Sequence, residues 1–260
     1  MPQKPSSPIR VMTLNLRFGL ADDGPNSWPY RKDALAILLK KHPVDFFAFQ
    51  EANDFQIEFI AGVLESYGFI GQRKPAPSFW QNNVVFYDRR SWNLTGKDHF
   101  FLSPTPDIPS RFRQSRWPRQ CTFGRFAAQG RNIVCINTHL DFKSRIQKAG
   151  AEIILRRLER FDARSPAILM GDFNCGEGSS AYRVFTAPSG AAPFHNVFKK
   201  NQPSTHHDFT GVGRGKAIDW ILYRGSVKPL TAEVITDRFA GSLVSDHFPV
   251  KAAFAWSGRS

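Results

Sequence analysis

The sequence contains few cysteines and lacks a long apolar run. Its three cysteines, an odd number, show no CxxC spacing, which argues against a disulfide framework or a zinc site and favours a reducing compartment. We expect all three to be buried thiols; they are Cys121, Cys135 and Cys175. No apolar stretch approaches the roughly 20 residues that a membrane span requires. We therefore expect a protein without a membrane span, located in the cytoplasm.

The first eight residues also lack the apolar core of a secretory signal. They are polar and proline-rich, so we expect residues 1–8 to form a flexible segment. After Pro8 there is no linker-like change in composition, no internal repeat and no low-complexity tract. With 260 residues, 42% of them hydrophobic, the chain can bury one sizeable core. We therefore expect residues 9–260 to form a single domain, and the protein to be a monomer.

Acidic residues are outnumbered, and in one segment they are absent. The formal net charge is +13, which attracts polyanions. Between Ser110 and Leu140 there are six arginines and no acid. This segment is either a track for a phosphate backbone beside an active site or part of a generally basic, solvated surface; the sequence leaves both interpretations open.

Strand-like and helix-like stretches alternate along the chain. Helical spacing of apolar residues predicts helices over 27–42, 54–67, 144–161 and 179–185. Short apolar runs predict strands over 9–16, 44–50, 84–87, 91–102, 121–126, 133–137, 166–170, 217–223, 227–235 and 248–254. The glycine-rich residues 211–215 lack the flanks of a nucleotide-binding motif, and we expect a mobile loop there. The pattern predicts a layered α/β domain with helices on the outer faces of its sheets.

Six short polar patches lie at the ends of these apolar runs, so we expect the fold to bring them to one edge of the sheets. Together they supply carboxylates, carboxamides and two imidazoles, which is the inventory that a divalent-metal phosphoesterase needs. The patches are residues 14–16 (LNL), 49–51 (FQE), 137–141 (NTHLD), 171–174 (GDFN), 218–220 (IDW) and 245–247 (SDH).

Glu51 and Asn15 are the candidate metal ligands. Glu51 follows a buried run, where a carboxylate is costly unless it is paired or binds a cation. Mg²⁺ prefers oxygen ligands and often takes only one or two carboxylates, so Glu51 with the Asn15 carboxamide fits a sparse magnesium shell. A strand-end glutamate in water is the alternative.

Two further patches supply candidates for proton transfer and phosphate binding. Asp172 and Asn174 are two residues apart and point the same way if the strand geometry continues; a simple turn is the alternative. His247, oriented by Asp219 from inside an apolar strand, could activate water near neutral pH. Asp246 would be a further ligand to metal or water, although a Ser-Asp-His sequence is often only a loop.

His139 follows the predicted strand over 133–137. It could protonate or stabilise the leaving oxygen and bind phosphate, with Asp141 orienting it or lying in solvent. Residues 206–208 (HHD) are interpreted as a polar loop rather than a substrate contact.

The ordered set of patches resembles the endonuclease/exonuclease/phosphatase superfamily, which includes deoxyribonucleases, abasic-site endonucleases, sphingomyelinases and inositol-polyphosphate 5-phosphatases. The resemblance extends from about Ile9 to about Phe254. It implies a four-layered αββα sandwich, in which two mixed β-sheets pack face to face with helices outside. It also implies Mg²⁺ or Mn²⁺ bound by Glu51, with help from Asn15 and Asp246.

The resemblance assigns roles to the remaining residues as well. It implies that Asp172 orients or deprotonates the attacking water, while Asn174 and His139 stabilise the transition state. Asp219 and His247 would form an Asp-His pair. Schemes within the superfamily differ on whether that histidine takes the proton or only holds the phosphate.

Some positions separate the chain from particular members. Abasic-site endonucleases carry an acid where this chain has Arg17, and the Thr-His-Leu-Asp setting of His139 is closer to deoxyribonucleases, sphingomyelinases and an uncharacterised bacterial subgroup. That subgroup is also similar around Arg31, Trp117 and Arg119. The residues that we predict to bind substrate are Arg31, Asn83, Arg113, Arg116, Arg119 and Asp141.

These observations predict a divalent-metal-dependent phosphoesterase that hydrolyses phosphodiester bonds, with nucleic acid as the favoured substrate because of the charge. One alternative is a phosphatase or phosphodiesterase for inositol phosphates, phospholipid head groups or other small phosphates. A second is an inactive nucleic-acid-binding module on the same scaffold, although every expected catalytic position holds a competent residue.

Overall fold

Two six-stranded β-sheets form the centre of the computed structural model, which describes residues 7–188 and 192–257. In spatial order, the first sheet consists of β11 (Val227–Val234), β12 (Val250–Trp256), β1 (Ile9–Asn15), β2 (Phe46–Ala52), β4 (Asn82–Asp88) and β3 (Tyr67–Ile70). The second consists of β5 (Asn93–Phe101), β6 (Gln120–Ala128), β7 (Arg131–His139), β8 (Ala167–Asp172), β10 (Asp219–Arg224) and β9 (His195–Asn196).

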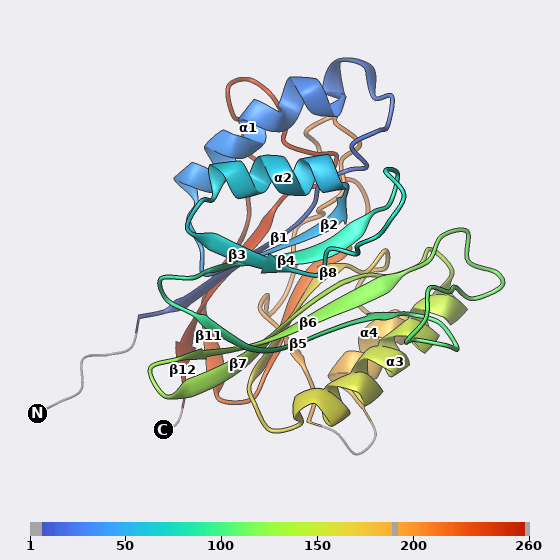
Figure 1. The fold of residues 1–260 in the computed structure, drawn as a ribbon, viewed down its shortest axis with the longest axis vertical. Helices are drawn as coiled ribbons and strands as arrows, with labels where there is room; N and C mark the ends of the chain where they lie inside the picture. The colour runs from blue at the N-terminus through green and yellow to red at the C-terminus, as the bar shows by residue number, and fades with distance from the viewer. Residues whose placement is uncertain (1–6, 189–191, 258–260) are drawn as a thin grey trace, which may run out of the picture.

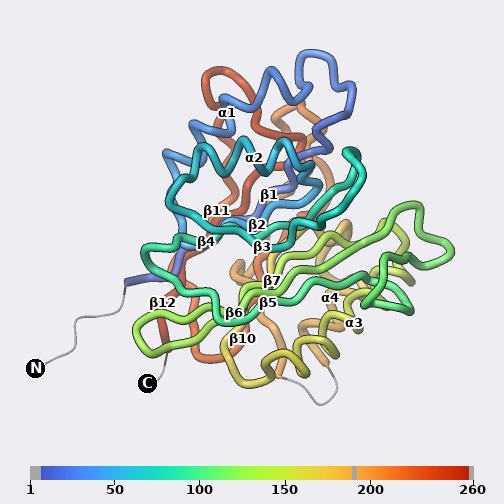
Figure 2. Tube along the Cα trace, in the orientation of Figure 1, coloured from blue at the N-terminus to red at the C-terminus, as the bar shows by residue number. Residues whose placement is uncertain are grey.

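α-Helices cover the outer faces of this pair of sheets (Figure 1). The helices α1 (Trp28–Lys41) and α2 (Asp54–Val63) lie over the first sheet, and α3 (Ser144–Asp162) and α4 (Ser180–Thr186) lie over the second. A short 3₁₀ helix, η1 (Gly24–Asn26), precedes α1. The chain trace in Figure 2 shows the two sheets face to face between the helix layers. The predicted four-layered αββα sandwich with two mixed sheets is confirmed.

The alternation of side chains along the strands separates three apolar cores. On β2, Phe47 and Phe49 pack toward α1 and α2, whereas Phe46 and Ala48 belong to the core between the sheets. A third core joins the second sheet to α3 and α4. Successive residues of a strand face opposite sides, so a strand covered on both faces is apolar throughout. This is why β2 reads as an uninterrupted apolar run.

Strand direction places the polar patches at one end of the sandwich. β1 runs parallel to β2, and β7 runs parallel to β8, so their carboxyl ends coincide within each sheet. β10 runs antiparallel to β8 with Asp219 opposite Asp172, and the start of β12 lies opposite Thr13 near the end of β1. The last residues of four strands and the first residues of two others therefore share an edge.

One sequence-based boundary is wrong. The helix predicted over 54–67 ends at Val63, and Tyr67–Ile70 forms β3, which pairs with β4. The Leu64 N–H donates to the Ile60 carbonyl and closes the helix three residues before Tyr67, where the sequence pattern had placed its end. At the other end, Asn53 and Gln56 form a capping box that fixes the start of α2. The two-residue strand β9 and the helix η1 were not predicted.

Other expectations can be compared directly with the structure. All three cysteines are free; two are buried and Cys175 is half-buried. Residues 211–215 contain no helix or strand, as expected for a loop. In the part of the chain that the structure describes, no helix combines the length and apolar character needed to cross a membrane.

Gly171 is the position where the fold is least tolerant of a side chain. Its φ is +150°, and a Cβ there would overlap the Thr138 carbonyl on the neighbouring strand. We expect Gly171→Ala to lower the free energy of unfolding by about 2–4 kcal/mol, from backbone strain and steric overlap together. Urea denaturation measures this loss. Gly130→Ala is the matched control, because its φ is +74° but nothing lies within 4 Å of the added Cβ. It should cost about 1 kcal/mol, and equal losses in the two variants would contradict the account.

Candidate active site

The structure brings the predicted strand-end residues into one hydrogen-bonded cluster. Asn15, from the first sheet, donates through Nδ2 to Glu51 Oε1 (3.2 Å) and to Asp172 Oδ2 (3.0 Å) in the second sheet. Asp172 Oδ2 lies 3.3 Å from His139 Nε2 and 3.9 Å from His247 Nε2. Residues separated by up to 232 positions in sequence therefore meet around one carboxylate.

The loop after β1 holds Glu51 in place. The Phe18 N–H donates to Glu51 Oε2 (2.7 Å), and the Arg17 N–H donates to Asn15 Oδ1 (2.9 Å). The Arg17 guanidinium pairs with Asp23 at 2.8 Å and lies 3.8 Å from Asp246 Oδ2. Arg17, which occupies the position of an acid in abasic-site endonucleases, thus places a positive charge beside Asp23 and Asp246.

Strained backbone marks the same residues. Arg17, Glu51 and Asn174 have φ values of +59°, +58° and +51°. Side-chain-bearing residues rarely adopt this left-handed region, and such strain is often found at functional sites because the surrounding structure must maintain it. Here the strain turns the chain immediately after β1, within β2 and after β8, where the side chains must leave the sheets.

Asn174 and His139 form the second arm of the cluster. The Asn174 N–H donates to Asp172 Oδ1 (2.8 Å), and Asn174 Nδ2 lies 2.9 Å from His139 Nε2. Gln147, near the start of α3, donates to the carbonyls of both Asp141 (2.7 Å) and Asn174 (2.9 Å). The predicted Asp172–Asn174 pair therefore points into the site. Gln147 joins the loop after β7 to the loop after β8.

The predicted Asp-His pair is present. His247 Nδ1 lies 2.8 Å from Asp219 Oδ2, and both side chains are almost fully buried. The Asp219 N–H donates to Thr205 Oγ1 (3.1 Å), and Ser245 Oγ donates to the Asn15 carbonyl (2.6 Å). The segment before β12 is thereby tied to the end of β1. His206, which we had interpreted as part of a polar loop, has its ring centroid 4.9 Å from that of His247.

Burial and neighbouring charges move the pKa values of these groups apart. Burial, together with the charge of Asp219, raises the pKa of Asp172 to about 7. Burial lowers the pKa of His247, but the charge and hydrogen bond of Asp219 and the charges of Asp172 and Asp246 outweigh it and raise that pKa to about 10. For His139, burial and the charges of Arg119 and His247 lower the pKa well below its usual range. At neutral pH His247 is therefore cationic and His139 is neutral.

The donor set fits a divalent cation. Each Glu51 carboxylate oxygen accepts one hydrogen bond although it has lone pairs for two. Donor atoms of Asp172, Asp219 and His247 lie within 4.8 Å of one another, as do those of a second group formed by His247 with His206 and Asp246. Glu51 belongs to neither group, and His247 could ligate a cation only in its neutral form. Among the described residues, the buried Asp219 Oδ1 has no hydrogen-bond partner. Crowded, buried and incompletely satisfied oxygens are what a hard cation such as Mg²⁺ stabilises.

Three of the residues predicted to bind substrate lie on the loop between β5 and β6. Arg119 is 7% exposed and is close enough to Glu51, Asp172 and Asp141 for their charges to act on its pKa, which burial nevertheless lowers. Arg113 and Arg116 are exposed on the same loop. Of these three, Arg119 is the one on whose pKa the charges of Glu51 and Asp172 act.

The other three lie elsewhere. The buried Arg31 guanidinium donates to three backbone carbonyls, one of them that of Arg17 (3.2 Å), so it supports the loop after β1. Asn83 donates to the Gln120 carbonyl (2.7 Å) between the sheets. Asp141 accepts hydrogen bonds from Ser115 Oγ and the Lys143 N–H, and so anchors the β5–β6 loop. Their polar groups form these hydrogen bonds inside the protein, and contact of Arg31, Asn83 and Asp141 with substrate stays a prediction.

The arginine-rich segment is not a continuous track. Arg131 begins β7, and His139 ends it eight residues later, roughly 26 Å away at a rise of about 3.3 Å per residue. Arg125 pairs with Asp162 at 3.1 Å, near the end of α3. The arginines of the β5–β6 loop therefore lie toward the candidate site. Arg125 and Arg131, on β6 and β7, lie toward the opposite end of the sandwich.

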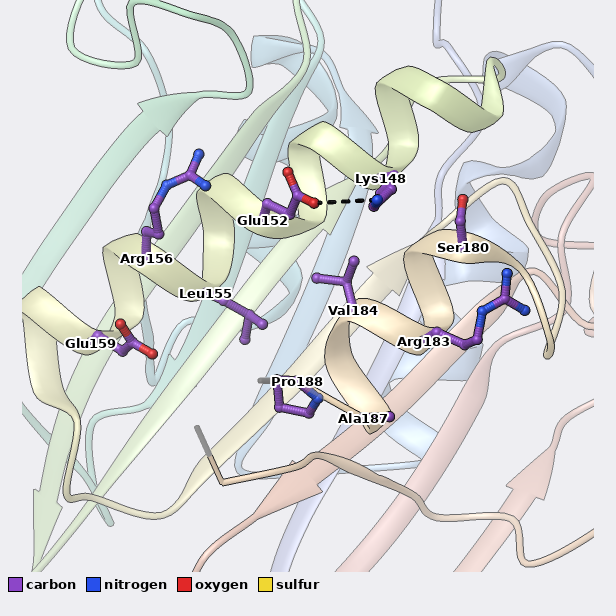
Figure 3. A pocket seen from close by; sticks show the side chains of 10 residues that line it. All are labelled: Lys148, Glu152, Leu155, Arg156, Glu159, Ser180, Arg183, Val184, Ala187 and Pro188. Carbon is purple, nitrogen blue, oxygen red and sulfur yellow. Dashed lines mark ion pairs between the residues drawn. The ribbon is translucent and has the colours of Figure 1, made fainter. Parts of the chain in front are cut away.

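A pocket of about 550 Å³ lies between α3 and α4, but it is separate from this chemistry (Figure 3). Charges of both signs line it, including the Lys148–Glu152 ion pair at 3.8 Å. None of the strand-end polar residues contributes to its lining. The site is therefore identified by its donor groups, not by the volume of the cavity.

Comparisons with known proteins identify the family and the fold. Residues 12–247 match the model of the endonuclease/exonuclease/phosphatase family. A member of that family from Bacteroides vulgatus is similar in structure, with a TM-score of 0.89, 24% identity, and coverage of 96% of this chain and 100% of that one. A mannosyl-6-phosphatase from Bacteroides thetaiotaomicron gives a TM-score of 0.86 and 25% identity, with coverage of 95% and 100%. No curated protein matches the chain.

The catalytic domain of human nocturnin, solved with a bound sulfate anion, is a more distant structural match. Its TM-score is 0.76 and its identity 20%, with coverage of 97% of this chain and 94% of that one. The family match spans most of the sequence, so the chain belongs to the endonuclease/exonuclease/phosphatase family, whose members are phosphoesterase hydrolases.

The Asp219–His247 pair gives a direct test of the electrostatics. Because the folded pKa of His247 is above its ordinary value of 6.5, the pairing stabilises the fold fully below pH 6.5, and this contribution is lost as the pH rises toward 10. We expect Asp219→Asn to lower the His247 pKa by at least about 2 units, because it removes the neighbouring charge that raises the pKa most. NMR titration of the ring protons of the metal-free protein measures this value. Asp246→Asn should lower it less, and a His247 pKa unchanged by Asp219→Asn would contradict the assignment.

Proposed function

We propose that the protein is a divalent-metal-dependent phosphodiesterase acting on nucleic acid. The observation that carries the proposal is the meeting of Glu51, Asp172 and His247 in one cluster bridged by Asn15. Carboxylates for a cation, a carboxylate that can accept a proton and a cationic imidazole are the groups that water attack on phosphorus requires.

Glu51, Asn15 and Asp246 would hold Mg²⁺ or Mn²⁺. Such an ion, when bound, polarises a phosphoryl oxygen and offsets its negative charge. Arg17 lies beside Asp246 and would limit how much negative charge the loop presents to a substrate phosphate. Each oxygen of Glu51 accepts a single hydrogen bond, and Asn15 Oδ1 accepts one, from the Arg17 N–H.

The pKa values support a division of roles between Asp172 and His247. A pKa of about 7 suits Asp172 to accept the proton of the attacking water. A pKa of about 10 keeps His247 protonated, so its Nε2–H would donate to the phosphate while Asp219 fixes the ring through Nδ1. Asn174 and the neutral His139 would bind the oxygens that gain charge in the transition state.

The charge of the protein favours a polyanionic substrate. The net charge is +13, and the β5–β6 loop carries Arg111, Arg113, Arg116 and Arg119 next to the site. Positive potential near an active site raises the local concentration of an anionic substrate. A nucleic acid would contact this loop with phosphates on either side of the scissile one.

A sugar or other small phosphate monoester is the second candidate. It is favoured by the likeness to the Bacteroides thetaiotaomicron mannosyl-6-phosphatase at 25% identity. Hydrolysis of single-stranded DNA, RNA, bis-p-nitrophenyl phosphate and mannose 6-phosphate, each with and without Mg²⁺, separates the two candidates. Turnover of the monoester alone would overturn the nuclease proposal.

If a metal ion is required, substitution of Glu51 should strongly lower turnover. EDTA should abolish hydrolysis, and Glu51→Gln should lower turnover at saturating Mg²⁺ by about two decades or more, because residues that merely support metal ligands already contribute 10- to 100-fold. Glu58→Gln is the matched control, because Glu58 is exposed on α2. Activity in EDTA, or equal rates for the two variants, would argue against the metal role.

His247 provides the second functional prediction. We expect His247→Ala to lower turnover by about two to four decades, the range for loss of a group that moves or holds a proton in the transition state. A steady-state assay on the best nucleic acid substrate measures this. Retention of the parental rate by His247→Ala would exclude the Asp-His pair from the reaction.

A further inference from the structure

A pocket of about 400 Å³ opens directly beside Glu51, and most of its lining residues are apolar. Five of them contribute aromatic rings, and we call this the aromatic pocket; they are Phe18, Phe79, Trp80, Trp117 and Phe142. Arg119 and Glu51 also line it, so the pocket is continuous with the carboxylate cluster. Its walls come from the loop after β1, the segment before β4, the β5–β6 loop and the turn after β7. Figure 2 shows the segment before β4 and the β5–β6 loop extending from the same end of the sandwich.

The rings are unusually accessible for apolar side chains. Phe79, Trp117 and Phe142 are 57%, 46% and 68% exposed. Large apolar side chains gathered at one surface site, and not scattered, mark a binding surface. The β5–β6 loop that presents Trp117 is held to the protein by Ser115 and Lys143, so the ring has a fixed support.

Guanidinium groups lie over three of these rings. Arg73 lies 4.3 Å from the Trp80 ring centroid, Arg116 lies 5.1 Å from that of Trp117, and Arg119, which itself lines the pocket, lies 5.2 Å from that of Phe142. These three cation–π pairs combine flat apolar faces with positive charge. This combination suits a ligand that is itself a flat ring attached to an anion.

Two buried N–H groups in the lining of the aromatic pocket have no acceptor among the described residues. Within residues 7–188 and 192–257, Arg119 Nε and Trp80 Nε1 have no hydrogen-bond partner. Only 7% of Arg119 is exposed. Leaving its buried Nε–H unpaired therefore costs free energy unless a ligand supplies an oxygen. The orphan donors therefore point to an acceptor-rich group next to the rings.

We propose that the aromatic pocket binds a nucleobase adjoining the scissile phosphate, so that the substrate is a single-stranded nucleic acid. The inference rests on the proposed function and specifies its substrate. Stacking on aromatic rings accepts any base and requires an unpaired strand, because bases inside a duplex are already stacked. A sugar ring would instead need several hydroxyl partners. Apart from the charged Arg17, Glu51 and Arg119, which adjoin the carboxylate cluster, the lining offers one neutral amide, Gln81.

Binding of two matched strands tests the inference. One is a fluorescein-labelled eight-residue oligothymidylate, and the other is a strand of the same length built from abasic tetrahydrofuran phosphates. Fluorescence anisotropy in EDTA, which prevents turnover, should show that the protein binds the oligothymidylate about 5- to 100-fold more tightly, the range for one stacked base. Trp117→Ser and Phe142→Ser should each remove most of this preference and leave the affinity for the abasic strand unchanged.

Tyr30→Ser is the control, because Tyr30 is an aromatic residue outside the pocket whose exposure of 70% matches that of Phe142. It should bind both strands as the parent does. Equal affinity of the parent for the two strands, or equal effects of Tyr30→Ser and Phe142→Ser, would overturn the base assignment.

Hydrolysis assays keep this outcome separate from failure of the proposed function. If the parent cleaves single-stranded DNA with Mg²⁺ but binds both strands equally, the pocket assignment is wrong and the nuclease stands. If it cleaves only mannose 6-phosphate, and Trp117→Ser raises the KM for that sugar, both the nuclease and the base assignment are wrong.

Discussion

The Asn15 carboxamide joins the two halves of the active site. Its single amino group donates to Glu51 in its own sheet and to Asp172 in the other, across 157 positions of sequence. A donor shared between two carboxylates favours their charged forms, which burial would otherwise disfavour. The registry of the sheets, the strained turns after the strands and the placement of His247 all serve to keep this bridge in position.

Below the bridge, a second polar contact sets the spacing of the sheets. Gln50 Nε2 donates to Asn137 Oδ1 (2.7 Å), and Asn137 Nδ2 donates to the Phe49 and Val84 carbonyls (2.8 Å each). All these groups are buried among apolar side chains, so a shift of one sheet against the other would leave them unpaired. These hydrogen bonds thus hold the two sheets in register beneath the cluster. Electrostatic catalysis needs preorganisation of this kind.

Much of the site could be predicted from sequence because each patch follows a strand whose direction the fold determines. Glu51, Asp172 and His247 needed only the inference that strand ends meet. For Arg31 and Asp141 the sequence shows a charge but not its partner inside the protein; the carbonyls to which Arg31 donates lie in distant segments. The aromatic pocket was missed because Phe79 and Phe142 come from separate loops whose meeting depends on the packed sheets. Tyr67–Ile70 was missed because four residues after a helix carry too little periodicity to indicate a strand.

The central claim is that the strand-end residues form a single cation-bearing cleft acting on phosphate. A crystal structure of the protein soaked with Mn²⁺ and a non-hydrolysable single-stranded phosphorothioate tests it most directly. We expect an anomalous peak within coordinating distance of Glu51, with a phosphate oxygen of the strand bound between that ion and His247 Nε2. An ordered strand bound elsewhere, with no anomalous peak beside Glu51, would contradict the claim.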